Sequence, residues 1–302
     1  MGGGVYDLRR LRLLHELSLR GTLAEVAEAL HQSPSSVSQQ LALLEREVGQ
    51  PLLRKVGRRV RLTSAAEVLV EHTAAILDRL DRAAAELAGA EEKASGTMRV
   101  AIFQSAALAF TVQMLDHLQT HHPQLRVTVS QREPETALHQ TWLRSFDLVI
   151  AEQYPGHAAP WHPELDRVGL TSDRLQLGVP DGWSDVGSIA DCADRPWVME
   201  PPGAASRHWA EQACRSAGFE PDVRFETADL QTHLALIEAG MAVAILPGLL
   251  QASTRARLRL LDLAGGPRRT VFTATRGSIA ETPRVRACRA ALAAAVSSAD
   301  PS

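Results

Sequence analysis

The chain has 302 residues, enough for two or three domains, and its hydrophobic content of 45% can supply proper cores. No apolar run approaches the roughly 20 residues that a membrane span requires, so we expect no membrane partner. The net charge of −3 is uneven: residues 1–62 carry ten basic and six acidic side chains, or +4, which leaves −7 for the rest. A basic head on an acidic body is typical of a DNA-binding module fused to another domain.

Residues 7–48 predict three helices. The first covers residues 7–20, where leucines recur at every third position. The second begins at Thr22, which forms a predicted capping box with Glu25. Ser33 can cap the third helix, with Pro34 at its first position, where a missing N–H costs nothing.

The third helix has two contrasting faces. Its buried face is formed by apolar residues at helical spacing: Val37, Leu41, Leu44 and Val48. Its opposite face carries short, uncharged side chains: Ser35, Ser38 and Gln39, with Ser36 near the margin and Ser33 at the start. Such side chains reach base edges without filling a major groove, so we interpret them as base-reading residues. The alternative is an ordinary helical hairpin whose second helix happens to be polar.

The segment after this helix favours the DNA-binding interpretation. Two short apolar runs, at 52–53 and 60–62, bracket a turn at Gly57 and predict a β-hairpin. The hairpin is strongly basic, with Arg54, Lys55, Arg58, Arg59 and Arg61. A basic hairpin beside a recognition helix predicts a wing that lies along phosphates. We therefore assign contacts with the DNA backbone to Thr22, Arg54, Lys55, Arg58 and Arg59.

These motifs resemble the LysR-type transcriptional regulators. The matching segments are YDLRRLRLL (6–14), LAEVAEALHQSPSSVSQQLALLEREVGQPLLRK (23–55) and GRRVRLTSAAE (57–67), and the resemblance extends over essentially the whole chain. It implies a winged helix-turn-helix, a double-stranded DNA operator, a small-molecule effector and assembly as a homodimer or homotetramer. This chain has Pro34-Ser35 where the family often has Gln-Pro, Gln39 where it often has Arg, and Ala66 where Gly is usual. The changes at Pro34 and Gln39 affect the expected operator sequence rather than the binding mode.

A long helix is predicted from Ser64 to about Lys93. Ser64 and Glu67 suggest a second capping box. Six residues alternate spacings of four and three in a coiled-coil-like seam: Leu69, Thr73, Ile76, Leu80, Ala83 and Leu87. The seam could pack on the protein's own body, but a helix of mainly alanine and charged residues favours pairing with a second copy. The resemblance implies the same, since the family's linker helix dimerises. We place a hinge at Ser95-Gly96.

From residue 97 the pattern predicts strands alternating with helices, which favours a parallel sheet with right-handed crossovers. The first group has strands at 98–103, 125–130 and 146–151, and helices at 106–119 and 135–144. The second has strands near 175 and at 197–200, 223–227 and 242–247, and helices at about 204–217 and 229–239. A strand at 270–276 and a helix at 282–297 follow. The pattern suggests two α/β lobes with a cleft between them.

The predicted fold class is therefore α/β, with an N-terminal all-α winged helix-turn-helix and a long linker helix. The resemblance implies a body like that of periplasmic binding proteins, in which the last strand and helix return to the first lobe. The predicted domains are 1–63 for DNA binding, 64–94 for the linker and 97–302 for effector binding. The first lobe covers about 97–165 and 270–302, and the second about 166–269.

Ligands in open α/β sheets bind beyond the carboxyl ends of strands, near helix amino termini. Three such places supply the candidate effector residues: Gln104, Ser105, Glu200, Gly203, Ala204, Ser206, Thr227 and Asp229. Free helix N–H groups favour a ligand with an anionic or carbonyl group. Glu200 would repel an anion, so a ligand that also carries an amine or several hydroxyls remains an alternative. Ser105 and Asp229 could instead be plain helix caps. The loop 131–135 is a weaker candidate.

Other functions have little support in the sequence. It contains no nucleophile elbow, glycine-rich phosphate loop or metal-spaced His/Cys cluster, so we expect no catalytic residue, metal or cofactor. His121 and His122 are adjacent, so they cannot lie on one face of a helix as paired ligands. One competitor is a small-molecule binding protein of the same body fold without a role on DNA. The basic head and the absence of a visible signal peptide argue against it and suggest a cytoplasmic location.

Overall fold

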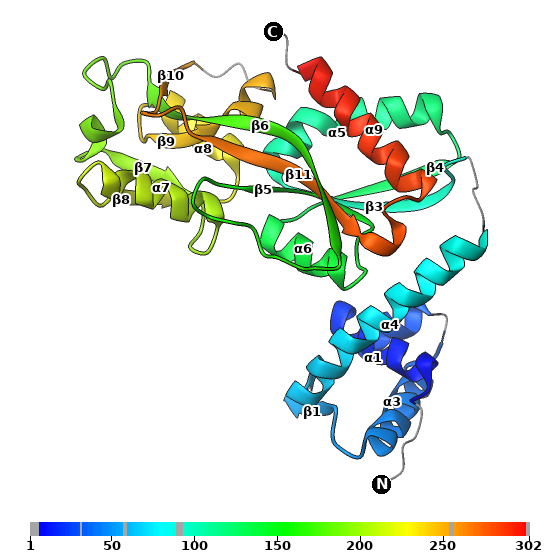
Figure 1. Ribbon diagram of the computed structural model, residues 1–302. Helices are drawn as coiled ribbons and strands as arrows, with labels where there is room; N and C mark the ends of the chain where they lie inside the picture. Colours follow the sequence, from blue (N-terminus) through cyan, green and yellow to red (C-terminus); the bar gives the residue numbers. More distant parts are fainter. Residues whose placement is uncertain (1–5, 31, 57–58, 89–92, 254–256, 300–302) are drawn as a thin grey trace. The chain divides into compact units, whose positions relative to one another are not determined.

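The structure, a computed structural model, describes residues 6–30, 32–56, 59–88, 93–253 and 257–299 (Figure 1). The chain forms two compact units, residues 1–90 with 142–145, and residues 91–141 with 146–302. Within the described ranges, no helix combines the length and the apolar character needed to cross a membrane. We describe each unit by itself.

The first unit begins with three helices: α1 (Leu8–Arg20), α2 (Leu23–Ala29) and α3 (Pro34–Val48). Asp7 caps α1 by accepting from the backbone N–H of Arg9, and Gly21 ends it in the left-handed conformation. Ser33 caps α3, and Pro34 occupies its first turn, as predicted. The helices share one core, to which α1 and α3 contribute mainly leucines.

The two predicted capping boxes are wrong in detail. The Thr22 hydroxyl accepts from Glu25 N at 3.3 Å, as predicted. It also donates to Glu25 Oε2 at 2.7 Å, so the Glu25 carboxylate bonds to the Thr22 side chain instead of the Thr22 backbone N–H. At the long helix the cap is Thr63, whose Oγ1 accepts from Ala66 N at 3.3 Å. Ser64 is the first residue of that helix, one position later than a cap.

The predicted wing is an antiparallel pair of short strands, β1 (Leu53–Val56) and β2 (Arg59–Leu62). Leu53 pairs with Leu62, and Arg54 pairs with Arg61. Leu52, just before β1, is buried in the core of the unit. The predicted turn at Gly57-Arg58 lies outside the described residues.

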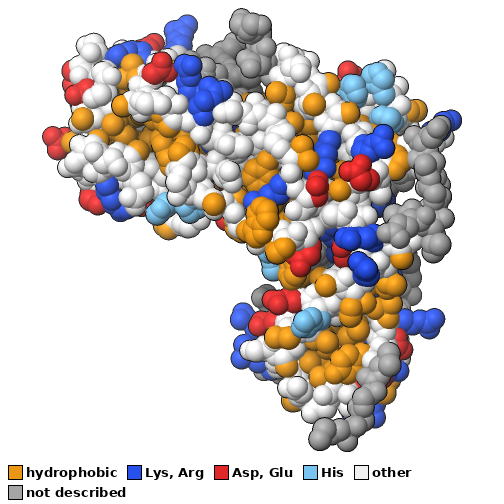
Figure 2. Space-filling view, viewed as in Figure 1, with side chains coloured by type: hydrophobic (Ala, Val, Ile, Leu, Met, Phe, Trp, Pro, Cys, Tyr) orange, Lys and Arg blue, Asp and Glu red, His pale blue; other side chains and the backbone are white. Residues whose placement is uncertain are grey.

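Only some residues of the predicted seam on helix α4 (Ser64–Ala88) face outward. Thr73 is fully buried against the helical core, and Leu69 is half-buried. By contrast, Val68, Ile76 and Leu80 are 56%, 44% and 46% exposed. Figure 2 shows apolar side chains gathered on the visible surface of this unit. The side chain of Leu87 lies outside the described residues. The predicted seam therefore mixes an inward face with an outward one.

The second unit contains the predicted β-α-β-α-β succession. Strands β3 (Gly96–Ile102), β4 (Leu125–Gln131) and β5 (Leu148–Gln153) pair in parallel in the order β4-β3-β5. Helices α5 (Gln104–His121) and α6 (Pro134–Trp142) provide the crossovers, and α9 (Pro283–Ala299) packs beside α5. Apolar residues from β3, α5, β5 and α9 form one core. These elements, together with β11 (Arg268–Arg276), make up what we call the first lobe.

The second lobe is built on the far end of a 16-residue strand, β6 (Leu165–Pro180). That end pairs with β9 (Ala244–Pro247) and with β10 (Leu258–Asp262), a strand that the sequence analysis did not predict. β7 (Pro196–Met199) and β8 (Asp222–Glu226) form a parallel pair. Helices α7 (Ala205–Ser216) and α8 (Leu230–Glu238) follow β7 and β8 along the chain, and apolar residues of this lobe form two cores.

Two long strands link the lobes. β11 returns after the second lobe and lies between β5 and β6, antiparallel to both, as Figure 1 shows in orange and green. Its register shifts between Val271 and Phe272. The sheet is therefore mixed rather than purely parallel. The two-lobed α/β body with an N-terminal helix-turn-helix unit and a long α4 confirms the predicted fold class.

Candidate ligand pocket and nucleic-acid interface

The outward face of the first half of α3 consists of uncharged polar side chains. Ser35, Ser38 and Gln39 are exposed, and Ser36 is half-buried, whereas Val37, Leu41 and Leu44 are buried. Ser33 Oγ accepts from Ser36 N at 3.1 Å and lies 2.9 Å from Ser35 Oγ, so these two hydroxyls are already hydrogen-bonded to each other. Within the described residues, the side chains of Ser38 and Gln39 form no hydrogen bond, so they present free donors and acceptors.

The wing places two like charges opposite each other. Arg54 and Arg61 are cross-strand partners, both exposed, and no carboxylate pairs with either in the described part of the chain. Like charges directly across a strand pair are destabilising unless an anion neutralises them. A phosphate backbone supplies such anions. The side chains of Lys55, Arg58 and Arg59 lie outside the described residues, and Thr22 uses its hydroxyl to cap α2.

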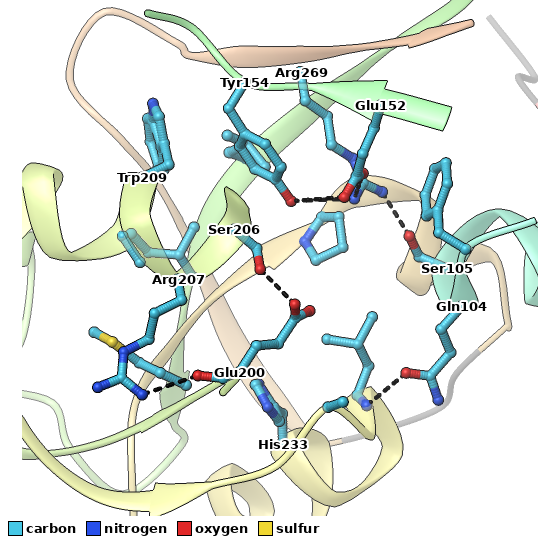
Figure 3. Close-up of a pocket in the computed structure, with 18 of the residues that line it drawn as sticks. Gln104, Ser105, Glu152, Tyr154, Glu200, Ser206, Arg207, Trp209, His233 and Arg269 are labelled. Atoms are coloured by element: carbon cyan, nitrogen blue, oxygen red, sulfur yellow. Dashed lines mark hydrogen bonds and ion pairs between the residues drawn. The ribbon is translucent and has the colours of Figure 1, made fainter. Parts of the chain in front are cut away.

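The body contains a pocket between its two lobes, of about 660 Å³ including the part open to solvent (Figure 3). Elements of both lobes line it: the start of α5, the end of β5 and the start of β11 from the first, and β7, α7, α8 and β9 from the second. Its walls combine aromatic and aliphatic side chains with carboxylates and two arginines. This mixture is typical of small-molecule sites.

Arg269 is the most connected side chain of the pocket. Its Nε donates to Asp173 Oδ2 at 2.8 Å and its Nη2 donates to Ser105 Oγ at 2.7 Å, while Nη1 pairs with Glu152. Tyr154 O–H donates to Glu152 Oε1 at 3.3 Å. Burial alone would lower the pKa of Arg269, but the charges of Glu152 and Asp173 outweigh it and raise the pKa, so the guanidinium stays charged.

Gln104 joins the lobes directly. From the first residue of α5, its Nε2 donates to Asp229 Oδ1 at 2.8 Å, and its Oε1 accepts from Leu230 N at 2.9 Å. Asp229 is also the cap of α8, accepting from Gln231 N at 3.1 Å. Gln104 Oε1 satisfies a free N–H at the start of α8, and its Nε2 bonds to the capping carboxylate, so the first lobe contributes to capping a helix of the second.

Glu200 follows β7 and points into the pocket toward Ser206, whose hydroxyl donates to its carboxylate (Figure 3). Burial raises the pKa of Glu200 to about 7, and the hydrogen bond from Ser206 only partly opposes that shift. Arg207, the next residue of α7, donates to the backbone oxygen of Glu200 at 2.9 Å rather than to its carboxylate. The charge of Arg207 is directed instead to Glu211 and Glu226.

The structure brings some predicted residues into the pocket and leaves others outside it. Gln104, Ser105, Glu200 and Ser206 line it, whereas Gly203, Ala204, Thr227 and Asp229 do not. Ser105 does not cap α5: it is buried in the first turn, and its hydroxyl accepts from Arg269. Asp229 does act as a cap, as the plainer alternative predicted.

Sequence reasoning missed several pocket residues: Glu152, Tyr154, Trp209, His233 and Arg269. Glu152 lies at the carboxyl end of a predicted strand, so the rule that supplied Gln104 could have found it. Glu133, in the weaker candidate loop, also lines the pocket. Arg269 lies just before a predicted strand, and nothing local in the sequence signals its partners. In the described part of the chain, no group of three or more His, Cys, Asp or Glu side chains is placed to hold a metal ion.

Two family descriptions match the chain: "Bacterial regulatory helix-turn-helix protein, lysR family" over residues 8–67 and "LysR substrate binding domain" over residues 91–297. A malonate utilization transcriptional regulator from Klebsiella pneumoniae is 26% identical over 263 residues, covering 85% of this chain and 84% of that protein. The transcriptional dual regulator GltC from Bacillus subtilis is 25% identical over 251 residues, covering 83% and 84%.

Solved structures share the fold over almost the whole chain. A full-length OxyR variant from Pseudomonas aeruginosa is similar with a TM-score of 0.76 at 20% identity, covering 97% of this chain and 95% of that one. Full-length CbnR complexed with its target DNA is similar with a TM-score of 0.56 at 20% identity, covering 97% and 100%.

Proposed function

Because this chain belongs to the LysR family of DNA-binding transcriptional regulators, which are not enzymes, we propose that a small molecule bound in the pocket of the body controls its binding to an operator. The DNA-binding domain is residues 1–63, the linker 64–94 and the effector domain 97–302. The protein acts in the cytoplasm as a homodimer or homotetramer, with α4 as the dimerising element.

The observation that carries the DNA-binding assignment is the pairing of an uncharged polar face on α3 with an unneutralised arginine pair on the wing. Ser35, Ser38 and Gln39 read bases in the major groove, with Ser33 and Ser36 at the edge of the contact. Arg54 contacts the DNA backbone, together with Thr22, Lys55, Arg58 and Arg59. Base contacts supply specificity, and the wing supplies affinity for any sequence.

The assignment is tested on a preferred site selected from a random DNA library. Gln39→Ala should cost about 1–3 kcal/mol on that site and relax specificity at one base pair. Arg54→Ala should weaken binding to all sequences alike and lower the dependence of log K on log salt by roughly one. If Gln39→Ala loses affinity equally on selected and random DNA, Gln39 does not read a base.

The effector assignment is supported by the position of the pocket, which is lined by both lobes. A molecule that binds one arrangement of the lobes better than another shifts the equilibrium between them. The backbone N–H groups at the start of α5 and the side chains of Gln104, Ser105, Glu200 and Ser206 supply polar contacts. Four other predicted residues do not line the pocket and contribute by shaping the loops that carry these contacts: Gly203, Ala204, Thr227 and Asp229.

A further inference from the structure

The charged donors of the pocket are already paired within the protein. All three nitrogens of the Arg269 guanidinium bond to Asp173, Glu152 or Ser105. The Arg207 guanidinium is bonded to two carboxylates and to a backbone oxygen. Both arginines are therefore already ion-paired within the protein, which weakens their attraction for an anionic ligand.

Two pocket carboxylates, those of Glu200 and Glu133, are not ion-paired in this way, whereas Glu152 is paired with Arg269. The carboxylate of Glu200 receives only the Ser206 hydroxyl, and that of Glu133 forms no hydrogen bond or ion pair in the part of the chain that the structure describes. Glu133 and Glu152 both repel the negative charge of Glu200. The carboxyls of Glu200 and Glu133 therefore lack a cationic partner within the described residues, and a bound cation would supply one.

His233 provides an independent indication of the same kind. This pocket residue is 2% exposed, and its Nε2 lies 2.8 Å from the backbone oxygen of Thr227, a contact that requires the proton on Nε2. Burial lowers the pKa of His233, so its ring is neutral and Nδ1 is a bare acceptor. That buried Nδ1 has no hydrogen-bond partner. An unsatisfied buried acceptor is costly, and a ligand that donates to it removes the cost.

His233 and Glu200 belong to the same end of the pocket. Thr227, which accepts from His233, donates its own N–H to Met199, the residue just before Glu200, at 3.0 Å. Figure 3 draws His233 beside the base of the Glu200 side chain, whose carboxylate turns toward Ser206, with Trp209 and Tyr154 higher in the view. An acidic acceptor and a neutral acceptor thus lie at one end of a pocket whose remaining walls are largely apolar and aromatic.

We propose that the effector is a small amine whose ammonium group donates to Glu200 and to Nδ1 of His233, with Glu133 adding attraction, and whose apolar body lies against Trp209 and the aliphatic wall. The inference rests on the proposed function, in which this pocket is the effector site. An ammonium has three donors and no acceptor, which matches the carboxylate of Glu200 and the bare Nδ1 of His233. Its charge distinguishes it from a polyol, which would satisfy the acceptors without neutralising the carboxylates.

The test compares matched probes on the full-length protein. Phenethylamine, phenethyl alcohol and phenylacetate share one body, as do butylamine, butanol and butyrate, and only the amines should raise the melting temperature. Calorimetry should then show that Glu200→Gln weakens amine binding by about tenfold or more, because a charged hydrogen bond becomes a neutral one. Glu220→Gln is the matched control: it removes the same charge from the same lobe, at a residue that does not line the pocket.

The proposal is overturned if an acid or alcohol raises the melting temperature as much as its amine, if neither amine raises it, or if Glu200→Gln binds amines as tightly as the parent protein. Footprinting of the selected operator with the same preparations separates this failure from a failure of the proposed function. A protein that protects its operator but ignores amines is still a regulator, with a different class of effector.

Discussion

Glu200 is held in the pocket with its carboxylate bonded to Ser206 and facing the charges of Glu133 and Glu152. Its pKa rises from the ordinary 4.5 to about 7, so the folded protein holds a proton that the unfolded chain releases. The stabilisation is present below pH 4.5 and is lost as the pH rises through about 7. At this residue, the ionised carboxylate that would bind a cation forms as the pH rises to neutrality, and stability falls over the same range.

We therefore expect Glu200→Gln to flatten the pH dependence of stability. Between pH 5 and pH 8, as the Glu200 carboxyl ionises, the free energy of unfolding of the parent protein should fall more than that of the variant. Urea unfolding at several pH values measures both. Glu220→Gln should leave the parent slope unchanged over this range, because hydrogen bonding to Arg215 lowers the pKa of Glu220. Parallel curves for Glu200→Gln and the parent would show that Glu200 titrates normally.

Arg269 leads to a prediction about the stability of the body itself. Arg269→Met should destabilise the body by about 3–5 kcal/mol, because Glu152 and Asp173 would be left buried without their cation. Arg268→Met is the matched control, since this neighbouring side chain is exposed and, within the described residues, its guanidinium bonds to Ser172 alone. We expect that control to cost less than about 1 kcal/mol. Similar losses in the two variants would mean that the buried ion pairs contribute little.

At the scale of single residues, the sequence predicts what depends on near neighbours. Ser33, Pro34 and Gly21 act within one turn of their helices, so their roles could be predicted from spacing. Arg269 could not, because its partners Ser105, Glu152 and Asp173 lie on other elements and converge only in the folded sheet. Even a local feature such as a helix cap is not fully predictable. Thr63 and Ser64 are both good caps, and the contacts of the folded wing decide that Thr63 caps α4.

At the scale of elements, α4 illustrates how one periodic pattern serves two partners. Leu69 and Thr73 turn toward the core of their own unit, whereas Ile76 and Leu80 remain exposed beyond it. The helical period alone could not show which of these residues face the core and which face outward, because both sets recur at helical spacing. The same limitation applies to β6, of which the sequence analysis recognised only the end near Leu175, because the remainder alternates polar residues that pair with β11.

The exposed part of α4 leads to a prediction about assembly. Leu80→Glu should dissociate the oligomer or make the protein insoluble, because the new charge would be buried against an apolar partner helix. Light scattering of the purified protein measures the mass directly. Arg82→Glu, on the opposite face of the same helix, should leave the mass unchanged. A Leu80→Glu variant that remains a folded dimer would place the interface elsewhere.

At the scale of the whole body, Gln104 couples the two lobes through a pair of hydrogen bonds to the start of α8. Gln104→Ala should lower the stability of the body by about 1 kcal/mol and speed hydrogen exchange at the Leu230 amide, which loses its acceptor. Gln119→Ala, an exposed change on the same α5 helix, is the control. Equal exchange at Leu230 in the two variants would show that the lobes do not depend on this link.

The position of β11 in the sheet has a consequence for synthesis on the ribosome. β11 lies between β5 and β6, so the central strand of the body is made after every strand that it joins. Helices α1 to α3 and the wing need no such late partner, because their core comes mainly from their own residues. Domains fold as they emerge, N-terminal ones first, so the DNA-binding unit can be complete while the body is still open. A chain terminated before β11 would therefore retain a DNA-binding head without its sensor, and could compete for operators in a way that no effector relieves.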